Sequence, residues 1–247
     1  MSPSDTIIIL PAYNEANHIL QTLADLSSVS TQAEYDLLVI NDGSTDQTAD
    51  LARQAGCPCL SLPVHLGYGT ALQTGYKYAV RNGYRYAIQM DTDGQHDVRF
   101  LPEIHRQLRL KTADVVVGSR FLPHDETSPT PRRPIYAGTL LRRLGIRLFR
   151  IILRLWGLSV TDPTSGFVGL QRSACEFLAT DIFPFDYPDA DVLLLLHRNG
   201  FAIREIPVYM YTNPERGSIH RGCAPFWYMI KELLAVLFAG VRSREIV

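Results

Sequence analysis

Long uncharged apolar runs are missing from this sequence of 247 residues. A helix that crosses a bilayer needs about 20 consecutive apolar residues, and no run of about 18 occurs, so we expect no ordinary membrane-spanning helix. The first ten residues, MSPSDTIIIL, also lack a basic region followed by a long apolar core, which argues against a secretory signal peptide. These absences predict a cytoplasmic location.

The sequence has neither a large excess of one charge nor a cysteine framework. Its 24 Lys and Arg residues nearly balance 25 Asp and Glu residues, so no global attraction to nucleic acid is expected. Four cysteines occur, and the only close pair, Cys57 and Cys59, does not have a zinc-knuckle spacing. Free or buried thiols in a reducing compartment are therefore expected. The composition, 46% apolar and 20% charged, fits a folded globular protein.

The first 120 residues alternate between strand and helix patterns. Apolar, β-prone segments are followed by segments with helical spacing of apolar residues, and Gly56 and Gly83 follow two of these helices. This alternation predicts a mostly parallel sheet with crossover helices. Ligands of such sheets bind beyond the carboxyl ends of the strands. The expected strands are 6–13, 35–44, 59–64, 84–91 and 113–121, with a further strand at 202–211.

Polar clusters follow three of these strands: PAYNE after the first, NDGSTD after the second and DTDGQ after the fourth. In isolation, Ser44 or Asp46 could cap the next helix, and an Asp-x-Asp spacing is common in surface turns. Two carboxylates at a strand end can also converge on Mg²⁺ or Mn²⁺, which prefer oxygen ligands. An EF-hand is unsupported, because no Glu occupies the twelfth position of a loop that starts at Asp91.

Taken in this order, the three clusters resemble the family 2 glycosyltransferases. The resemblance continues through GYGTALQTG (67–75), VVVGSRF (115–121), TDPTSGF (161–167) and DYPDADVLLLLHRNGF (186–201). It implies an α/β fold of the GT-A type, which binds nucleotide sugars on a mostly parallel central sheet with flanking helices. The subgroup most similar in pattern is the polyprenyl-phosphate sugar synthases, of which dolichol-phosphate mannose synthase is the best-known type. We expect one such domain over residues 1–225.

The resemblance implies a donor site for a nucleotide diphosphate sugar of the GDP-mannose or UDP-glucose class. Asp91, Asp93 and Gln95 would bind Mg²⁺ or Mn²⁺ between the two phosphates. Gly67 and Gly69 could form only a tight turn and a helix start, and Leu72 stands where a dinucleotide fingerprint needs glycine. The residues that would line the nucleotide pocket are Pro11, Tyr13, Asn14, Glu15, Asp42 and Gly69.

For the acceptor, the resemblance implies polyprenyl phosphate bound by two arginines. Arg120 ends the fifth strand, and Arg133 is the best match for the second arginine, with Arg132 as the alternative. Arg120 could instead form a surface ion pair. Ala137 stands where the subgroup often has serine, which leaves the acceptor contacts open. A basic loop with Arg216 and Ser218 would close over the donor diphosphate.

Four residues are the candidates for catalysis: Asp93, Arg120, Asp162 and Asp191. Asp162 could be only a turn residue before a proline, and Asp191 only an acid at a helix start. A phosphate acceptor is already ionised near neutral pH and needs positioning more than a strong base, which favours Asp162. A sugar hydroxyl on a glycan or lipid-linked sugar is the alternative acceptor. It would need a base, and Asp191 would then be favoured.

The segment 139–156 predicts a basic amphipathic helix. Seven arginines and no acidic residue occur between Thr127 and Thr161. This pattern is typical of helices at anionic membrane surfaces, although a core helix with a solvated basic face would look similar. A second amphipathic helix is expected within 226–247, where it could contact the membrane or a partner membrane protein. On a helical wheel, Arg143, Arg147, Arg150 and Arg154 lie opposite Leu141, Leu144, Leu148, Ile151, Ile152, Leu155 and Trp156.

The sequence thus predicts a metal-dependent, inverting hexosyltransferase, peripherally associated with the inner face of the membrane. Two other classes use similar residues. A non-catalytic binder of nucleotide sugars is disfavoured by the joint presence of the Asp pair, Arg120 and Asp162. A nucleotidyltransferase would also use paired carboxylates on an α/β sheet, but it would release pyrophosphate.

Overall fold

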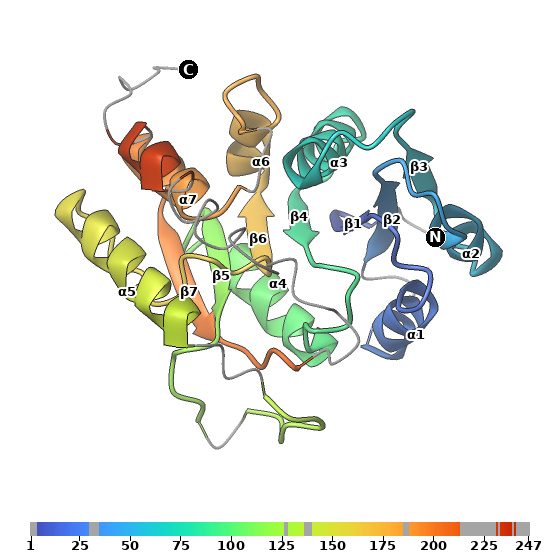
Figure 1. Cartoon of the computed structure of the whole chain (residues 1–247), viewed down its shortest axis with the longest axis horizontal. Coiled ribbons are helices and arrows are strands. Elements are labelled where there is room, and N and C mark those ends of the chain that lie inside the picture. The colour runs from blue at the N-terminus through green and yellow to red at the C-terminus, as the bar shows by residue number, and fades with distance from the viewer. Residues whose placement is uncertain are drawn as a thin grey trace.

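The computed structural model describes residues 4–29, 35–125, 128–135, 140–184, 188–212, 231, 233–238 and 240. Its sheet has the strand order β3-β2-β1-β4-β6-β5-β7 (Figure 1). The strands are β1 (Thr6–Ala12), β2 (Asp36–Asn41), β3 (Cys59–Ser61), β4 (Tyr86–Gln89), β5 (Val115–Ser119), β6 (Val168–Gln171) and β7 (Ile203–Pro207).

Most neighbouring strands run parallel, as predicted. The exception is β6, which pairs antiparallel with both β4 and β5. The local sequence pattern after the TDPTSGF turn does not show this direction. Because β6 enters the sheet from the opposite end, the turn at 161–167 lies at the edge where β4 and β5 end.

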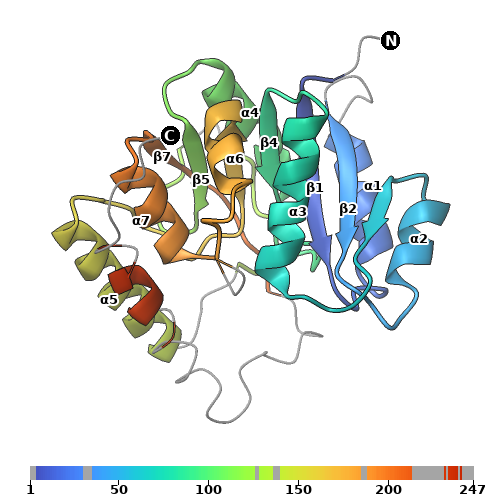
Figure 2. The same cartoon turned by 90° about the horizontal axis from the view of Figure 1, so that it is seen from above.

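Helices cover both faces of the sheet (Figures 1 and 2). In β1, Ile7 and Ile9 face one helical layer, and Ile8 and Leu10 face the other. The first layer contains α3 (Tyr68–Arg81), α5 (Leu140–Leu155), α6 (Arg172–Leu178) and α7 (Ala190–Arg198), and the second contains α1 (Ile19–Val29), α2 (Thr48–Gln54), η1 (Val98–Phe100) and α4 (Leu101–Arg109).

Two features of the helices go beyond the sequence prediction. Helix α6 was not expected, because its seven residues give too short a pattern to recognise, although Ala174, Cys175 and Phe177 pack into the core. Ile152 in α5 and Trp156 just after it are half-buried against the core. The helical wheel placed both on the apolar side but did not show which apolar residues the core covers.

No helix within the described ranges combines the length and the apolar character that crossing a bilayer requires.

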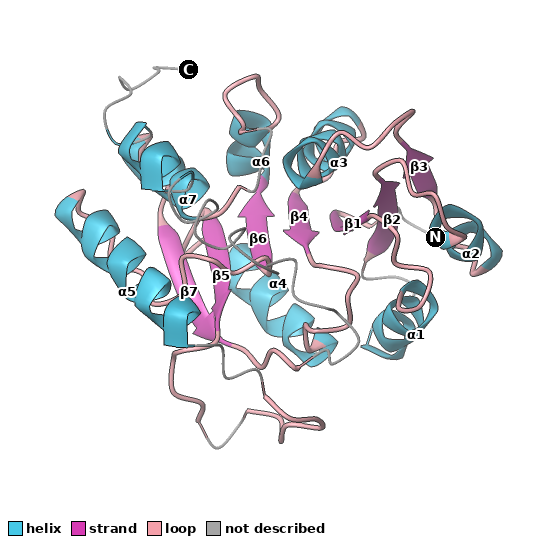
Figure 3. Cartoon of the chain, viewed as in Figure 1, coloured by secondary structure: helices cyan, strands magenta, loops and turns pink. Residues whose placement is uncertain are grey.

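The loop after β5 and the loop after β7 leave the sheet at the same end, since Ser119 pairs with Pro207 in the parallel register of β5 and β7 (Figure 3). Along the chain, β2 and β3 are added to the sheet on one side of β1, and β4 is added on its other side. The direction of addition therefore switches at β1, and open α/β sheets bind ligands at such a switch point.

Candidate functional site

Hydrogen bonds join the three polar clusters that the sequence analysis singled out. The backbone N–H of Asp42 donates to the carbonyl of Ala12 at 2.9 Å, which ties the end of β2 to the end of β1. The hydroxyl of Thr92 donates to the carbonyl of Pro11, also at 2.9 Å, which ties the turn after β4 to β1. The clusters therefore meet at one edge of the sheet, beside the switch point.

Asp42 holds the loop that precedes α3. It is buried, and its two carboxylate oxygens accept the backbone N–H groups of Leu66 at 2.8 Å and Gly67 at 2.9 Å. The Nδ1 atom of His65 lies 2.8 Å from Oδ2. Gly67 has φ of 101°, a left-handed conformation that favours glycine, and Gly69 is buried in the first turn of α3. Asp42 thus holds this loop in place at the edge of the sheet where the nucleotide pocket is expected.

Tyr13 and His65 form a flat aromatic surface at this edge. Their rings stack at a centroid distance of 3.8 Å and an interplanar angle of 17°, and Tyr13 is exposed. Gly43 makes the close approach possible, because a Cβ atom there would lie 2.4 Å from the backbone nitrogen of His65. Sequence reasoning missed His65, whose only signal was its position two residues before Gly67.

Asn14 and Glu15 lock the end of β1 to the start of α2. Asn14 adopts a positive φ of 54°, and its Oδ1 atom accepts the N–H of Thr45 at 2.8 Å. The N–H of Glu15 donates to the hydroxyl of Thr48 at 2.8 Å, and the Glu15 side chain is buried. Asp46 accepts the N–H of Thr48 at 3.0 Å. Burial alone would raise the pKa of Asp46, but hydrogen bonds, chiefly from Thr48, outweigh it and lower the pKa.

Three neighbours fix the carboxylate of Asp91. The Tyr68 hydroxyl donates to Oδ1 at 2.8 Å. His96 accepts the N–H of Asp91 on Nδ1 at 3.1 Å, so its proton lies on Nε2, 3.8 Å from Oδ2. A Cβ atom on Gly166 would lie 2.8 Å from Oδ2. Burial, reinforced by Asp91, holds the pKa of Tyr68 well above its usual value. The His96 side chain thus turns back to Asp91.

Asp93 lies in the same turn and is buried, and its Oδ1 atom accepts the N–H of Gln95 at 3.0 Å. Gln95 is half-buried, and its carbonyl accepts the N–H of Tyr211 at 2.7 Å. Among the described residues, no three His, Cys, Asp or Glu side chains form a group that could hold a metal by themselves. Mg²⁺ sites often use only one or two carboxylates and take further ligands from substrate phosphates. The Asp91–Asp93 pair fits a cation of that kind.

The loop 128–135 brings Arg133 to this turn. The Arg133 guanidinium donates to the carbonyl of Gly94 at 2.9 Å and lies 4.6 Å from the centre of the Tyr211 ring. Tyr211 in turn donates to Asp97 at 2.5 Å, and Asp97 is also bound by Arg99. Burial alone would raise the pKa of Asp97, but hydrogen bonds from Arg99 and Tyr211 lower it. Of the two alternative arginines, the one with a described side-chain contact to the turn is Arg133.

Arg120 and Asp162 bind each other. The Nε and Nη2 atoms of Arg120 reach the two oxygens of Asp162 at 2.6 Å each, and Nη2 also donates to the Thr164 hydroxyl at 2.8 Å. Both charged side chains are almost completely buried. Glu205 supports the pair by accepting the N–H groups of Asp162 at 2.7 Å and Thr161 at 2.6 Å. This bidentate pair joins β5 to the 161–167 turn, and a role of either residue toward substrate stays a prediction.

Asp191 lies in the first turn of α7 and is buried. Its Oδ1 atom accepts the N–H groups of Asp189 at 3.0 Å and Val192 at 2.8 Å. Burial raises the pKa of Asp191 to about 6, against the lowering effect of these hydrogen bonds. The raised pKa brings this carboxyl closer to the range that suits a general base.

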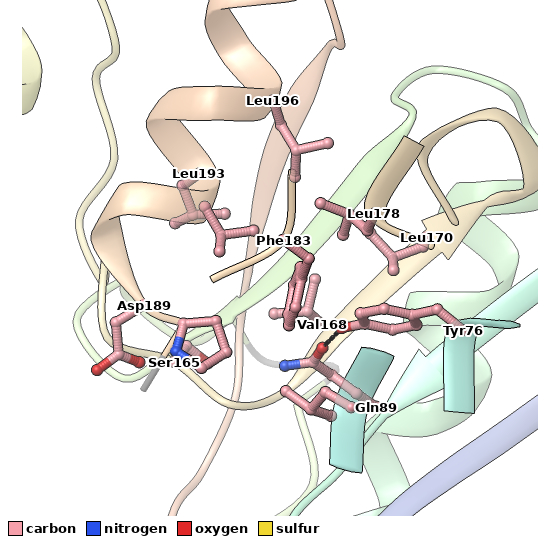
Figure 4. Close-up of a pocket in the computed structure, with 13 residues that line it drawn as sticks. Tyr76, Gln89, Ser165, Val168, Leu170, Leu178, Phe183, Asp189, Leu193 and Leu196 are labelled. Carbon is pink, nitrogen blue, oxygen red and sulfur yellow. Dashed lines mark hydrogen bonds between the residues drawn. The ribbon is translucent and has the colours of Figure 1, made fainter. Parts of the chain in front are cut away.

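A small cavity lies behind the sheet between α3 and α7 (Figure 4). Gln89, Ser165 and Asp189 supply polar groups to its wall, and Tyr76 donates a hydrogen bond to Gln89. Its volume of about 20 Å³ suits a single water molecule. It is too small for a hexose, so the donor is not expected there. Arg216 and Ser218, predicted to close over the donor, lie outside the described residues.

Two curated proteins are similar to this chain in sequence. The chain is 34% identical over 214 residues to the undecaprenyl-phosphate mannosyltransferase of Micrococcus luteus, a match that covers 82% of each chain. It is 27% identical over 232 residues to a dolichyl-phosphate beta-glucosyltransferase of Trichomonas vaginalis, with 84% of this chain and 64% of that protein covered.

Solved structures confirm the GT-A fold. Glucosyl-3-phosphoglycerate synthase from Mycobacterium tuberculosis, in complex with Mn²⁺ and UDP-glucose, superposes with a TM-score of 0.66 at 22% sequence identity. The superposition covers 95% of this chain and 78% of that one. At this identity the likeness concerns the fold alone. The strand-end clusters from Pro11 to Asp162 lie within residues 7–178. These residues match the family described as glycosyl transferase family 2, and the chain belongs to this family.

Proposed function

We propose that this protein transfers a hexose from a nucleotide diphosphate sugar to polyprenyl phosphate at the cytoplasmic face of the membrane. The observation that carries the proposal is the position of Arg133 over the turn that holds Asp91 and Asp93. A cationic side chain and a carboxylate pair side by side suit a reaction between a metal-bound diphosphate and a phosphate acceptor. The names of the two relatives, which act on undecaprenyl phosphate and dolichyl phosphate, support this acceptor.

The donor nucleotide would lie along the edge formed by β1, β2 and the loop before α3. The exposed ring of Tyr13, stacked on His65, offers a face for the base. Pro11, Asn14 and Glu15 would shape the nucleotide pocket, and Asp42 would keep the loop at 65–67 in place. The Mn²⁺ and UDP-glucose bound by glucosyl-3-phosphoglycerate synthase support a nucleotide sugar and a divalent cation as ligands.

In the proposed reaction, an oxygen of the acceptor phosphate forms a bond to C1 of the hexose. The bond between C1 and the donor diphosphate breaks on the opposite side, so the configuration at C1 inverts and nucleoside diphosphate leaves. A phosphate monoester has a second pKa of about 6, so the acceptor is largely ionised at neutral pH and needs little help from a base. Arg133 would orient it. A divalent cation held by Asp91 and Asp93 would neutralise charge on the departing diphosphate as a Lewis acid.

The metal role is tested by Asp93→Ala. We expect this variant to lose transfer while its circular dichroism spectrum remains that of the wild type, and excess chelator should abolish the wild-type activity. Full activity of the variant, or full activity in chelator, would contradict the metal role. Analysis of the released product separates the reaction classes: nucleoside diphosphate supports glycosyl transfer, whereas pyrophosphate would indicate a nucleotidyltransferase.

One observation favours a second acceptor class, a sugar hydroxyl. The pKa of Asp191 is raised to about 6, which suits a base that removes a proton from a hydroxyl group. The test offers one labelled donor together with either a short polyprenyl phosphate or a panel of sugar acceptors. Transfer to polyprenyl phosphate that persists in Asp191→Asn supports the first proposal. Transfer to sugars alone, abolished in Asp191→Asn, would establish the second.

A further inference from the structure

The segment 208–212, just after β7, lies between the turn after β4 and the loop 128–135. On one side, the N–H of Tyr211 donates to the carbonyl of Gln95 at 2.7 Å. On the other side, Tyr211 pairs antiparallel with Ile135, and a neighbouring backbone hydrogen bond of 3.0 Å continues this pairing. The backbone of Tyr211 therefore joins the turn that holds the proposed metal ligands to the loop that carries the proposed acceptor arginine.

The hydroxyl group of Tyr211 uses all of its hydrogen-bonding capacity. It donates to Asp97 at 2.5 Å, and it accepts from the Arg99 guanidinium at 3.0 Å and from the backbone N–H of Arg132 at 3.2 Å. A phenol offers one donor and two lone pairs, so these three contacts complete it. Arg99 also donates to the carbonyl of Thr130 at 3.0 Å. The hydroxyl thus ties the backbone of this loop to the ion pair of Asp97 with Arg99.

The aromatic ring of Tyr211 supports the guanidinium of Arg133. The guanidinium carbon lies 4.6 Å from the ring centre, which is within the range of a cation–π contact. One nitrogen of the same group donates to the carbonyl of Gly94 at 2.9 Å. A guanidinium has several N–H donors, and the Gly94 carbonyl takes one of them. Among the described contacts of Arg133, donors therefore remain for the oxygens of a phosphate.

Burial differs sharply between these two side chains. Tyr211 is 2% exposed, whereas Arg133 is exposed. A long arginine side chain on a loop has many accessible rotamers, and fixing one of them costs conformational entropy. The buried ring, held at its backbone and at its hydroxyl, gives the guanidinium a rigid surface on which to rest. The position of Arg133 relative to the turn after β4 therefore depends on Tyr211.

We infer that Tyr211 is a positioning residue for the acceptor phosphate, and that it acts through Arg133. Its ring holds the guanidinium over the turn that contains Asp91 and Asp93, and its hydroxyl holds the loop. The inference rests on the proposed function, in which Arg133 orients the acceptor. Loss of the Tyr211 side chain would leave Arg133 in the chain but misplace it, and a misplacement of about 1 Å can cost about 100-fold in rate.

Kinetics with short-chain polyprenyl phosphate, and with UDP-glucose or GDP-mannose as donor, test the assignment. In Tyr211→Leu, kcat/KM for the acceptor should fall about 10- to 100-fold. Tyr211→Phe keeps a ring for the cation–π contact and should recover most of that loss. Tyr209→Leu is the matched control, because the Tyr209 ring stacks on His124 at 3.9 Å instead. This control should stay within about twofold of the wild type. Thermal melts check that each variant is folded.

A double-mutant cycle with Arg133→Gln decides whether Tyr211 acts through Arg133. In the Arg133→Gln background, Tyr211→Leu should lower kcat/KM for the acceptor by less than about a further twofold, because coupled residues are not additive. Mn²⁺ affinity in the presence of nucleoside diphosphate should not change, since only backbone atoms join Tyr211 to Gln95. Full additivity, or a parallel loss of Mn²⁺ affinity, would indicate a general structural role and overturn the inference. So would wild-type kinetics of Tyr211→Leu, or a Tyr211→Phe variant as slow as Tyr211→Leu.

Hydrogen exchange separates this inference from the proposed function, because it needs no acceptor. The Arg132 amide should exchange about three to ten times faster in Tyr211→Phe and in Tyr211→Leu, since both remove its hydrogen-bond acceptor. Tyr209→Leu should leave this exchange unchanged. A wild-type protein that transfers to sugar hydroxyls but not to polyprenyl phosphate would refute the proposed acceptor, and faster Arg132 exchange would still support the hold of Tyr211 on the loop. Unchanged exchange in both Tyr211 variants would overturn the inference whichever acceptor is used.

Discussion

At the scale of single residues, the site depends on neighbours that orient Asp91. Tyr68, His96 and Gly166 come from three separate parts of the chain, and each restricts a different side of this carboxylate. Groups that hold a metal ligand in this way commonly affect metal affinity almost as strongly as the ligands do. The Tyr68 hydroxyl makes the shortest of these contacts.

Removing that hydroxyl should weaken metal binding. In Tyr68→Phe, we expect Mn²⁺ to bind at least about tenfold more weakly in the presence of nucleoside diphosphate, because Asp91 loses its orienting hydrogen bond. Electron paramagnetic resonance of free Mn²⁺ measures this affinity without any turnover. Tyr84→Phe is the control, since Tyr84 donates to Asp36 at the same 2.8 Å but at the opposite end of the sheet. Equal Mn²⁺ affinities for the two variants would contradict the assignment.

Asp191 should make stability depend on pH. Its folded-state pKa is raised from 3.8 to about 6, so the folded protein favours the protonated form. The resulting stabilisation is complete below about pH 4 and is lost as the pH rises through about 6. Asp191→Asn cannot ionise, so its stability relative to the wild type should improve by about 1 kcal/mol or more between about pH 4.5 and about pH 8. Urea unfolding at both pH values measures this, and a constant difference would refute it.

At the scale of elements, the 161–167 turn is held against β5 by one buried ion pair. Arg120 and Asp162 are 42 residues apart in sequence, and their side chains make two contacts of 2.6 Å. Glu205 on β7 binds the backbone of the same turn. The turn also carries Gly166, which lies against Asp91. The ion pair therefore positions this turn against Asp91, the proposed metal ligand.

Breaking the pair from one side should be costly. Arg120→Gln would leave Asp162 buried without its cation, and we expect the free energy of unfolding to fall by about 3–5 kcal/mol. Arg172→Gln is the matched control, because Arg172 forms an exposed pair with Glu176 at 2.7 Å, and such pairs contribute about 1 kcal/mol or less. If Arg120→Gln unfolded like the wild type but lost activity, Arg120 would belong to the acceptor site instead.

At the scale of the whole molecule, the proposed donor site draws on distant parts of the chain. Hydrogen bonds join the ends of β1, β2 and β4, and the loops that contain Arg133 and Tyr211 contact the turn after β4. A donor bound at this edge of the sheet would bridge these parts. The described residues supply two carboxylates rather than a complete metal cage, so cation and diphosphate should bind as a coupled pair.

Thermal unfolding should report this coupling. Mn²⁺ alone or nucleoside diphosphate alone should change the melting temperature little. Both together, at about 100 times their joint dissociation constant, should add about 2.7 kcal/mol, which corresponds to a rise of roughly 5–10 °C for a domain of this size. Asp93→Ala should abolish the joint effect. Full stabilisation of the wild type by nucleoside diphosphate in chelator would contradict the coupling.

Much of the site could be predicted from local sequence. Strand ends are recognisable from short apolar runs, and the topology rule for parallel sheets then brings Pro11, Asp42 and Asp93 to one edge. The direction of strand β6 and the presence of helix α6 could not be predicted, because they depend on pairing with β4 and β5 and on packing against α3. His65, Tyr68 and Gly166 were missed for the same reason: each acts through a neighbour that is distant in sequence.

The sequence by itself determined the family, the order of the strand-end clusters and the positive character of α5, because motifs, strand patterns and charges are local properties. Only the tertiary structure decided which side chains meet. It paired Arg120 with Asp162 and placed Arg133 against Gly94. It also packed Ile152 and Trp156 partly against the core while it left Leu148 and Ile151 exposed. A wheel shows only the spacing along one helix, whereas burial depends on the elements that pack against it.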